Sequence, residues 1–117
     1  MYLDGEYYQL HLRKSVLTLN SALDDLDPQI LFSTVLRPIL GIDDPTDDPN
    51  LFHLPENGNE MQIKNLVDSG KFSVGFGSFP VSVDQMKTIA DQGLIMPTKS
   101  TYVEPKLRSA LTIYELK

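Results

Sequence analysis

The feature that most constrains the fold is an apolar stripe that begins after Asp27-Pro28 and ends before Gly41. Asp27 is expected to cap a helix whose first position is Pro28, where the missing proline N–H costs no hydrogen bond. The apolar positions that follow have helical spacing: Ile30, Leu31, Val35, Leu36, Ile39 and Leu40. Pro38 should kink or end the regular part, and Gly41 should end the helix. This stripe therefore predicts the core helix.

The first twelve residues predict a β-hairpin. Asp4-Gly5 lies between Tyr2-Leu3 and an alternating stretch from Tyr7 to Leu12. An Asp-Gly pair in this setting favours a tight turn, because glycine accepts a positive φ at little cost. By the two-residue period of a strand, we expect Tyr8, Leu10 and Leu12 to share the face that packs on the core.

Five further segments complete the expected order of elements. The first is a short strand at 51–54, and the second is a helix with Met61, Ile63, Leu66 and Val67 that ends at Ser69-Gly70. A strand with Phe72, Val74 and Phe76 follows, and then a helix over Ser82 to Gln92 that ends at Gly93. The last is a strand with Leu111, Ile113 and Tyr114. The order β-β-α-β-α-β-α-loop-β predicts an α+β domain in which about three helices pack on one mixed sheet opened by the N-terminal hairpin.

Length and composition bound the class of protein. A chain of 117 residues suits one hydrophobic core, so residues 1–117 are expected to form a single domain. The absence of cysteine excludes disulfides, thiolate metal sites and cysteine nucleophiles, and it fits the reducing cytoplasm, where we expect this protein. Asp4 and Glu6 do not suit an export signal, and the apolar stretch 30–42 is shorter than the roughly 20 residues that cross a bilayer. No membrane partner is expected.

The charges are unevenly placed. The net charge of -6 repels polyanions and disfavours nucleic acid as a partner. Between residues 21 and 60 there are nine acids and one base, whereas residues 96–117 carry four bases (Lys99, Lys106, Arg108 and Lys117) and two acids. An acidic body thus carries a locally basic C-terminal region.

That region also carries a family resemblance. The run from Met96 to Leu111 reads Met-Pro-Thr-Lys-Ser-Thr-Tyr-Val-Glu-Pro-Lys-Leu-Arg-Ser-Ala-Leu. It resembles the C-terminal signature of an uncharacterised prokaryotic family, domain of unknown function 1015, whose pattern is Met-Pro-Pro-Lys-Ser-Thr, an aromatic pair, Pro-Lys, and a small residue before Leu. Thr98, Val103 and Ala110 depart from this pattern. Phe32 stands where the family often has histidine, which removes one candidate acid or base.

Other positions extend the resemblance over nearly the whole chain: Leu26-Asp27, Pro38, Leu40-Gly41-Ile42, Gly70, Phe76, Pro80 and Ser82-Val83. Members of the family are several times longer, so the resemblance implies the C-terminal portion of a larger protein. The activity of the family is unassigned, and the resemblance therefore implies a fold context more than a function.

The chemistry of the loop suits an anion. The candidate ligand-binding residues are Lys99, Ser100, Thr101, Tyr102, Lys106 and Arg108. Ammonium, guanidinium and hydroxyl groups bind phosphate or carboxylate, and the prolines at 97 and 105 restrict the segment and so lower its ordering cost. The alternative is a solvated connection whose hydroxyls bond its own backbone and whose Tyr102 anchors it to the core.

Other patterns lack the required spacing. Gly75-Phe76-Gly77 has no third glycine of a dinucleotide fingerprint, and the acidic loop from Asp43 to Asp48 misses the calcium-loop pattern. His11 and His53 stand in unrelated segments and make an incomplete zinc site. No metal is expected, no cofactor is identified, although a nucleotide fits the loop, and no catalytic residue is assigned.

Two functions follow as hypotheses. The first is binding of an anion, a phosphorylated metabolite or a nucleotide as part of a larger cytoplasmic enzyme. The second is a non-catalytic structural or interaction module, in which the loop docks on an N-terminal portion of a longer protein or on a second copy of the chain.

Overall fold

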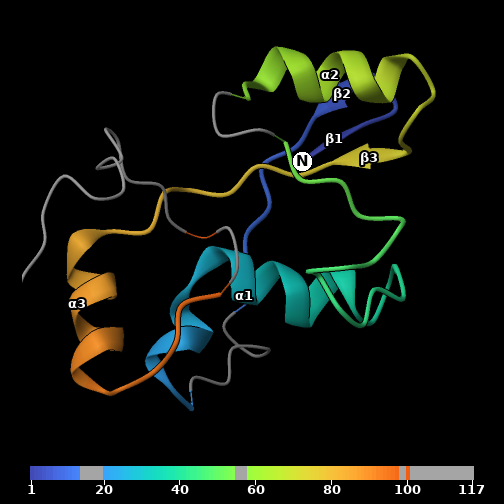
Figure 1. Ribbon diagram of the computed structural model, residues 1–117. Coiled ribbons are helices and arrows are strands. Elements are labelled where there is room, and N and C mark those ends of the chain that lie inside the picture. Colours follow the sequence, from blue (N-terminus) through green and yellow to red (C-terminus); the bar gives the residue numbers. More distant parts are fainter. Residues whose placement is uncertain (14–19, 55–57, 98–99, 101–117) are drawn as a thin grey trace, which may run out of the picture.

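The computed structural model describes residues 1–13, 20–54, 58–97 and 100 (Figure 1). The elements, in chain order, are β1 (Tyr2–Leu3), β2 (Glu6–Tyr7), η1 (Ala22–Asp25), α1 (Asp27–Leu31), η2 (Phe32–Leu36), α2 (Glu60–Asp68), β3 (Val74–Gly75) and α3 (Val83–Asp91). The expected α+β class, with an N-terminal hairpin and three α-helices, is confirmed. The last expected strand, Leu111 to Tyr114, lies outside the described residues.

The sheet has three short strands in the order β2-β1-β3. Tyr2 pairs with Tyr7 on one side and with Gly75 on the other, and both pairings are antiparallel, so no parallel pair of a mixed sheet occurs in the described residues. Asp4 and Gly5 have φ of 50° and 85°, the two positive values that a tight hairpin turn requires. Residues 51–54, expected as a strand, are not paired in this sheet.

The central helix begins as expected and then changes its hydrogen bonding. Pro28 lies in its first turn, and α1 continues directly into η2. Arg37 N donates to Phe32 O at 3.0 Å and Leu40 N donates to Val35 O at 3.2 Å, both reaching five residues back. Pro38 has no N–H to continue the regular four-residue ladder, which accounts for this wider turn. Gly41, with φ of 70°, ends the segment as predicted.

The wider turn changes which side chains are buried. Leu36 is buried, but Ile39 is 71% exposed and Leu40 is 44% exposed. The prediction that the whole stripe faces the core is therefore wrong at its C-terminal end, because the helical spacing on which it rested does not persist past Phe32.

Helix α3 begins at its predicted cap, and both α2 and α3 end at the predicted glycines. Ser82 and Gln85 form a capping box at the start of α3, in which each side chain bonds the backbone N–H of the other, at 3.2 and 3.0 Å. Asn59 caps α2 by accepting from Gln62 N at 3.0 Å. Gly70 and Gly93 follow the two helices with positive φ, as C-terminal stops do.

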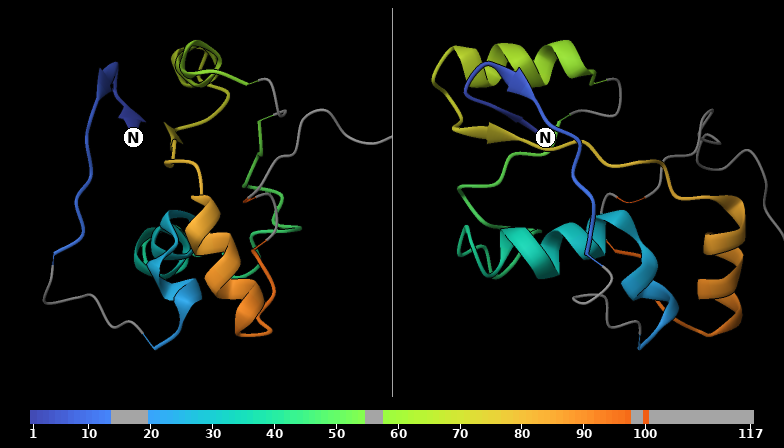
Figure 2. Two further views of the ribbon diagram at one scale, coloured as in Figure 1. Left: turned by 90° about the vertical axis from the view of Figure 1, so that its left-hand side faces the viewer. Right: turned by 180° about the vertical axis from the view of Figure 1, so that it is seen from behind.

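The elements form two packed groups, visible from both sides in Figure 2. In one group α2 packs on β1 and β3; in the other, η1 packs against α1 and α3. The buried apolar side chains are Tyr2 in the first group and Leu26, Leu36, Ile42 and Ile89 in the second. Two extended segments, one around residue 52 and one around residue 77, connect the groups (Figures 1 and 2).

The N-terminal hairpin presents a different core residue from the one expected. Tyr8 and Leu10 are 42% and 51% exposed, so the prediction that they face the core is wrong. Strand β2 ends at Tyr7, and the chain then leaves the sheet, so the strand period no longer decides which way Tyr8 and Leu10 face. Tyr2, at 1% exposed, takes the core position instead.

A three-residue polar cluster ties β1 to α2. The Tyr2 hydroxyl donates to Asp68 Oδ1 at 2.6 Å and accepts from Lys64 Nζ at 2.8 Å, and Lys64 Nζ also donates to Asp68 Oδ2 at 2.6 Å. The hydrogen bond from Lys64, followed by that from Tyr2, lowers the pKa of Asp68. The hydrogen bond to Asp68, followed by that to Tyr2, raises the pKa of Lys64. The bond to Asp68 also raises the pKa of Tyr2.

This cluster makes stability depend on pH in two windows. Because the folded pKa of Asp68 is lowered, its contribution is present above the ordinary carboxyl pKa of about 4 and is lost as the pH falls through the folded value. Because the folded pKa values of Lys64 and Tyr2 are raised, their contributions are present below about pH 10 and are lost as the pH rises through the folded values.

Urea unfolding of Asp68→Asn should show a weaker decline of stability in acid than the parent chain. Asp91→Asn, an exposed carboxylate without an ion-pair partner among the described residues, should leave the decline unchanged; equal profiles for all three would contradict the prediction.

Candidate functional site

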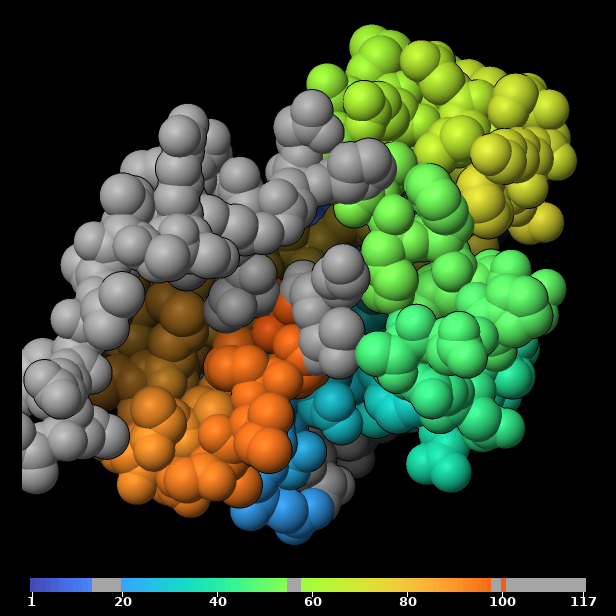
Figure 3. Space-filling view, in the orientation of Figure 1, coloured from blue at the N-terminus to red at the C-terminus, as the bar shows by residue number. Residues whose placement is uncertain are grey.

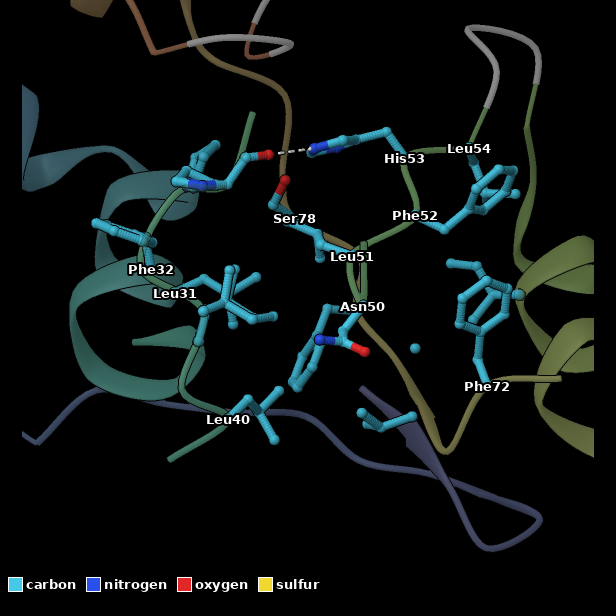
Figure 4. A pocket seen from close by; sticks show the side chains of 18 of the residues that line it. Leu31, Phe32, Leu40, Asn50, Leu51, Phe52, His53, Leu54, Phe72 and Ser78 are labelled. Atoms are coloured by element: carbon cyan, nitrogen blue, oxygen red, sulfur yellow. Dashed lines mark hydrogen bonds between the residues drawn. The ribbon is translucent and has the colours of Figure 1, made fainter. Parts of the chain in front are cut away.

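A cavity of about 430 Å³ lies between the two packed groups (Figure 4). Its size is within the range of about 300–1,000 Å³ typical of small-molecule sites. Three walls enclose it: the helix side, the segment 50–54, and the side formed by α2 and β3. Figure 4 shows Leu31, Phe32 and Leu40 on the first wall, facing Leu51, Phe52 and Phe72 across the cavity.

Two aromatic rings stack on each other in the lining. Phe52 and Phe72 stack with ring centroids 5.5 Å apart and an interplanar angle of 23°. Lys71 Nζ lies 5.8 Å from each centroid, within the range of a cation–π contact. Phe52 remains 52% exposed, so part of its ring is available to a further apolar group.

A few polar groups interrupt the apolar lining: Gln29, Asn50, His53 and Ser78. His53 Nε2 lies 2.8 Å from Pro45 O (dashed in Figure 4), which orients the imidazole. A carbonyl oxygen only accepts, so Nε2 carries the proton, and in the neutral ring Nδ1 is left as an acceptor. An apolar cavity with a small number of oriented polar groups has the character of a ligand site.

The acidic loop beside the cavity uses its carboxylates locally. Asp44 Oδ1 accepts from Thr46 N at 2.8 Å and also from the Thr46 hydroxyl, and these bonds lower the pKa of Asp44. Asp48 Oδ1 accepts from Asn50 N at 2.8 Å. Over the described residues, no three histidine, aspartate or glutamate side chains are grouped to hold a metal ion. The loop instead holds Pro45 against His53.

Of the ligand-binding residues predicted from sequence, Ser100 alone lies in the described part of the chain. Its hydroxyl donates to Pro97 O at 2.5 Å and its N–H to the same oxygen at 3.3 Å, so the hydroxyl bonds its own loop. The others, Lys99, Thr101, Tyr102, Lys106 and Arg108, lie outside the described residues.

Pro97 connects the cavity to the predicted loop. It lines the cavity, and the loop begins two residues later with Lys99. In Figure 3 the residues leading to Pro97 (orange) lie on the same face as the acidic loop and the segment 50–54 (green). The predicted anion-binding residues are therefore joined to the cavity wall by a short stretch of chain.

Sequence reasoning missed the cavity itself. The sequence predicts Phe52 and Leu54 in one strand and Phe72 in another, whereas all three line the cavity in the structure. The available signal was an excess of large apolar residues in segments too short for long strands.

Two general findings complete the description. Within the described ranges, no helix is both long enough and apolar enough to cross a membrane. Comparison of the chain with protein-family models, with curated proteins and with solved structures gives no match.

Proposed function

We propose that this chain binds a small cytoplasmic metabolite that combines an apolar ring with an anionic group, a nucleotide being the first ligand to test. The ring enters the cavity, and Lys99, Ser100, Thr101 and Lys106 hold the anion, with Tyr102 and Arg108 at the same loop. The observation that carries this proposal is the position of Pro97, which lines the cavity and leads directly into the loop.

The lining suits a planar heterocycle. A base packed on Phe52 gains stacking energy, because every nucleobase has a flat π face. His53 Nδ1 and the Asn50 amide supply an acceptor and further hydrogen-bonding groups for the ring edge. The anion then compensates the lysine charges without entering the apolar cavity, where an unpaired charge would be costly.

The resemblance to domain of unknown function 1015 supports a larger protein as the context of this binding. On that reading the chain is the C-terminal, ligand-binding portion of a cytoplasmic enzyme, and the catalytic groups come from the preceding portion. The proposal for this chain requires binding alone.

Titration of the full chain with ATP, AMP and inorganic phosphate, followed by amide NMR, tests the proposal. Nucleotides should shift the amides of 50–54 and of 97–108, and phosphate alone should shift the second set. Phe52→Ala should weaken nucleotide binding about tenfold, since stacking on a base contributes about 1–3 kcal/mol. The double variant Lys99→Ala, Lys106→Ala should weaken phosphate and nucleotide alike.

Lys87→Ala is the matched control for the lysine variant. It removes an exposed lysine from α3 that does not line the cavity, and it should leave binding unchanged. Phosphate and nucleotide binding that survives loss of Lys99 and Lys106 would contradict the loop assignment. Binding that survives Phe52→Ala would remove the cavity from the site.

A second function, a non-catalytic interaction module, is favoured by the exposed apolar side chains. Phe79, Val83 and Ile95 are 77%, 75% and 86% exposed. Such residues mark contact surfaces when they are contiguous. Sedimentation velocity should then show self-association, or association with the N-terminal portion of a longer family member, that Phe79→Ser or Ile95→Ser abolishes. A strictly monomeric chain that gains no stability from that portion argues against this function.

A further inference from the structure

A second, larger hollow of about 970 Å³ forms a groove beside the first cavity, and Gly75 of β3 lines both. One rim is the run from Tyr7 to Leu12, which leaves the edge strand β2, and the other is the run from Gly75 to Phe79. Ile30, Thr34 and Val35 of the central helix also line it. Figure 2 shows the N-terminal run descending from the sheet past the helix.

The N-terminal rim offers peptide groups that the described residues do not use. Tyr8 N donates to Met1 O at 2.8 Å, and no further backbone hydrogen bond within the described ranges involves Gln9 to Leu12. On the opposite rim Phe79 N donates to the Asp27 carboxylate at 3.1 Å, whereas Gly77 and Ser78 have no backbone partner in the described chain. Extended backbone whose N–H and C=O groups have no backbone partner pairs readily with another strand.

The side chains along the groove are apolar and exposed. Leu10 is 51% exposed and Phe79 is 77% exposed. A Cβ atom placed on Gly77 would meet nothing within 4 Å, so the space beside this backbone is open. A strand with apolar residues on one face would bury these side chains and pair with the peptide groups that have no backbone partner within the described ranges.

We propose that the segment Leu111–Tyr114 of this same chain occupies the groove as an added strand that pairs with Gln9 to Leu12. Leu111 and Ile113 alternate, as a strand with one apolar face requires. The groove and the first cavity share Leu31, Ile63 and Phe76 as lining, and Pro97 lines the first cavity, so the start of the C-terminal region is close by. The residues between Pro97 and Leu111 can span about 40 Å when extended.

The charges also agree with this occupant. Asp27 and Glu60 line the groove, whereas the region from Met96 to Lys117, which contains the strand, carries four bases against two acids, Glu104 and Glu115. The added strand fixes the far end of the Lys99 to Arg108 loop, whose near end is at Pro97. This proposal does not depend on ligand binding, and different measurements test it.

Disulfide trapping tests the proposal cleanly because the chain has no cysteine of its own. Leu10→Cys is combined with Thr112→Cys or with Ile113→Cys, since neighbouring strand residues point to opposite faces and the two variants together sample both faces of the added strand. Mild oxidation at low protein concentration should give a monomer with an internal disulfide for one of these pairs. The control pair, Asp91→Cys with Ile113→Cys, joins the same segment to α3 and should form at least tenfold less.

Dimers linked between chains as the sole product would assign the groove to a second copy and overturn the proposal. Equal trapping by the Leu10 and Asp91 pairs would also overturn it. Hydrogen exchange gives a second readout without altering the groove. The alternate amides of Gln9 to Leu12 that face the added strand should be protected in the full chain, and Ile113→Pro should reduce that protection at least tenfold while leaving α2 unchanged. Unprotected amides in the full chain would end the proposal.

Discussion

Replacing Leu26 by alanine is expected to lower the free energy of unfolding by about 2–5 kcal/mol. Leu26 is 0% exposed and stands between η1 and α1. Its N–H donates to Leu23 O at 3.1 Å, and its carbonyl accepts from Ile30 N at 2.9 Å, so the backbone on both sides is held in place. The surroundings can therefore collapse only partly into the cavity that the variant leaves. Urea denaturation followed by circular dichroism measures the loss.

Leu40→Ala is the control for this variant, because it removes the same atoms from a side chain that is 44% exposed. It should lose clearly less stability than Leu26→Ala, since less apolar surface is returned to water. Equal losses for the two variants would show that the group formed by η1, α1 and α3 is not a packed core.

Gly75→Ala should destabilise the fold by about 1–3 kcal/mol, the usual cost of overpacking. Gly75 lies in β3 opposite Tyr2, and a Cβ atom at this position would overlap Cγ2 of Ile63 on α2. The Ile63 side chain branches next to its own backbone and cannot simply swing away. Helix α2 must therefore move off the sheet or β3 must shift.

Gly77→Ala provides the matched control, two residues along the same segment. An added Cβ there meets nothing within 4 Å, and Gly77 does not have a positive φ. In thermal unfolding, the midpoint temperature of Gly77→Ala should lie near that of the parent chain. In an Ile63→Ala background, Gly75→Ala should cost less than in the parent, because the overlapping atom is gone. Equal stabilities of the two glycine variants would refute the close packing of α2 on β3.

The parts of the fold that could be predicted are those set by local chemistry. Asp4-Gly5 specifies its turn because both residues tolerate positive φ, and Ser82 with Gln85 specifies a helix start because the two side chains satisfy each other's backbone. The ends at Gly41, Gly70 and Gly93 follow the same logic. Each signal lies within a few residues of the structure that it specifies.

The parts that could not be predicted depend on contacts between distant segments. No residue near Tyr8 and Leu10 in the sequence indicates that the chain leaves the sheet after Tyr7. Likewise, no neighbouring residue indicates that Phe52 stacks on Phe72. The wider turn after Phe32 follows from Pro38, but the side chain that it buries is decided by packing. The candidate cavity is of this kind, since three separate segments form it, whereas the predicted loop residues were recognisable by their chemistry alone.

The position of β1 in the middle of the sheet has a consequence for how the chain folds. Tyr2 bonds Asp68, a residue 66 positions later, and pairs with Gly75 later still. A two-stranded hairpin is marginally stable by itself, so the hairpin of β1 and β2 becomes stable only when α2 and β3 pack against it. At about 5–20 residues per second, synthesis leaves it without these partners for several seconds. Refolding should accordingly end with closure of this long loop, whose entropy cost is met before the contacts of β1 with α2 and β3 repay it.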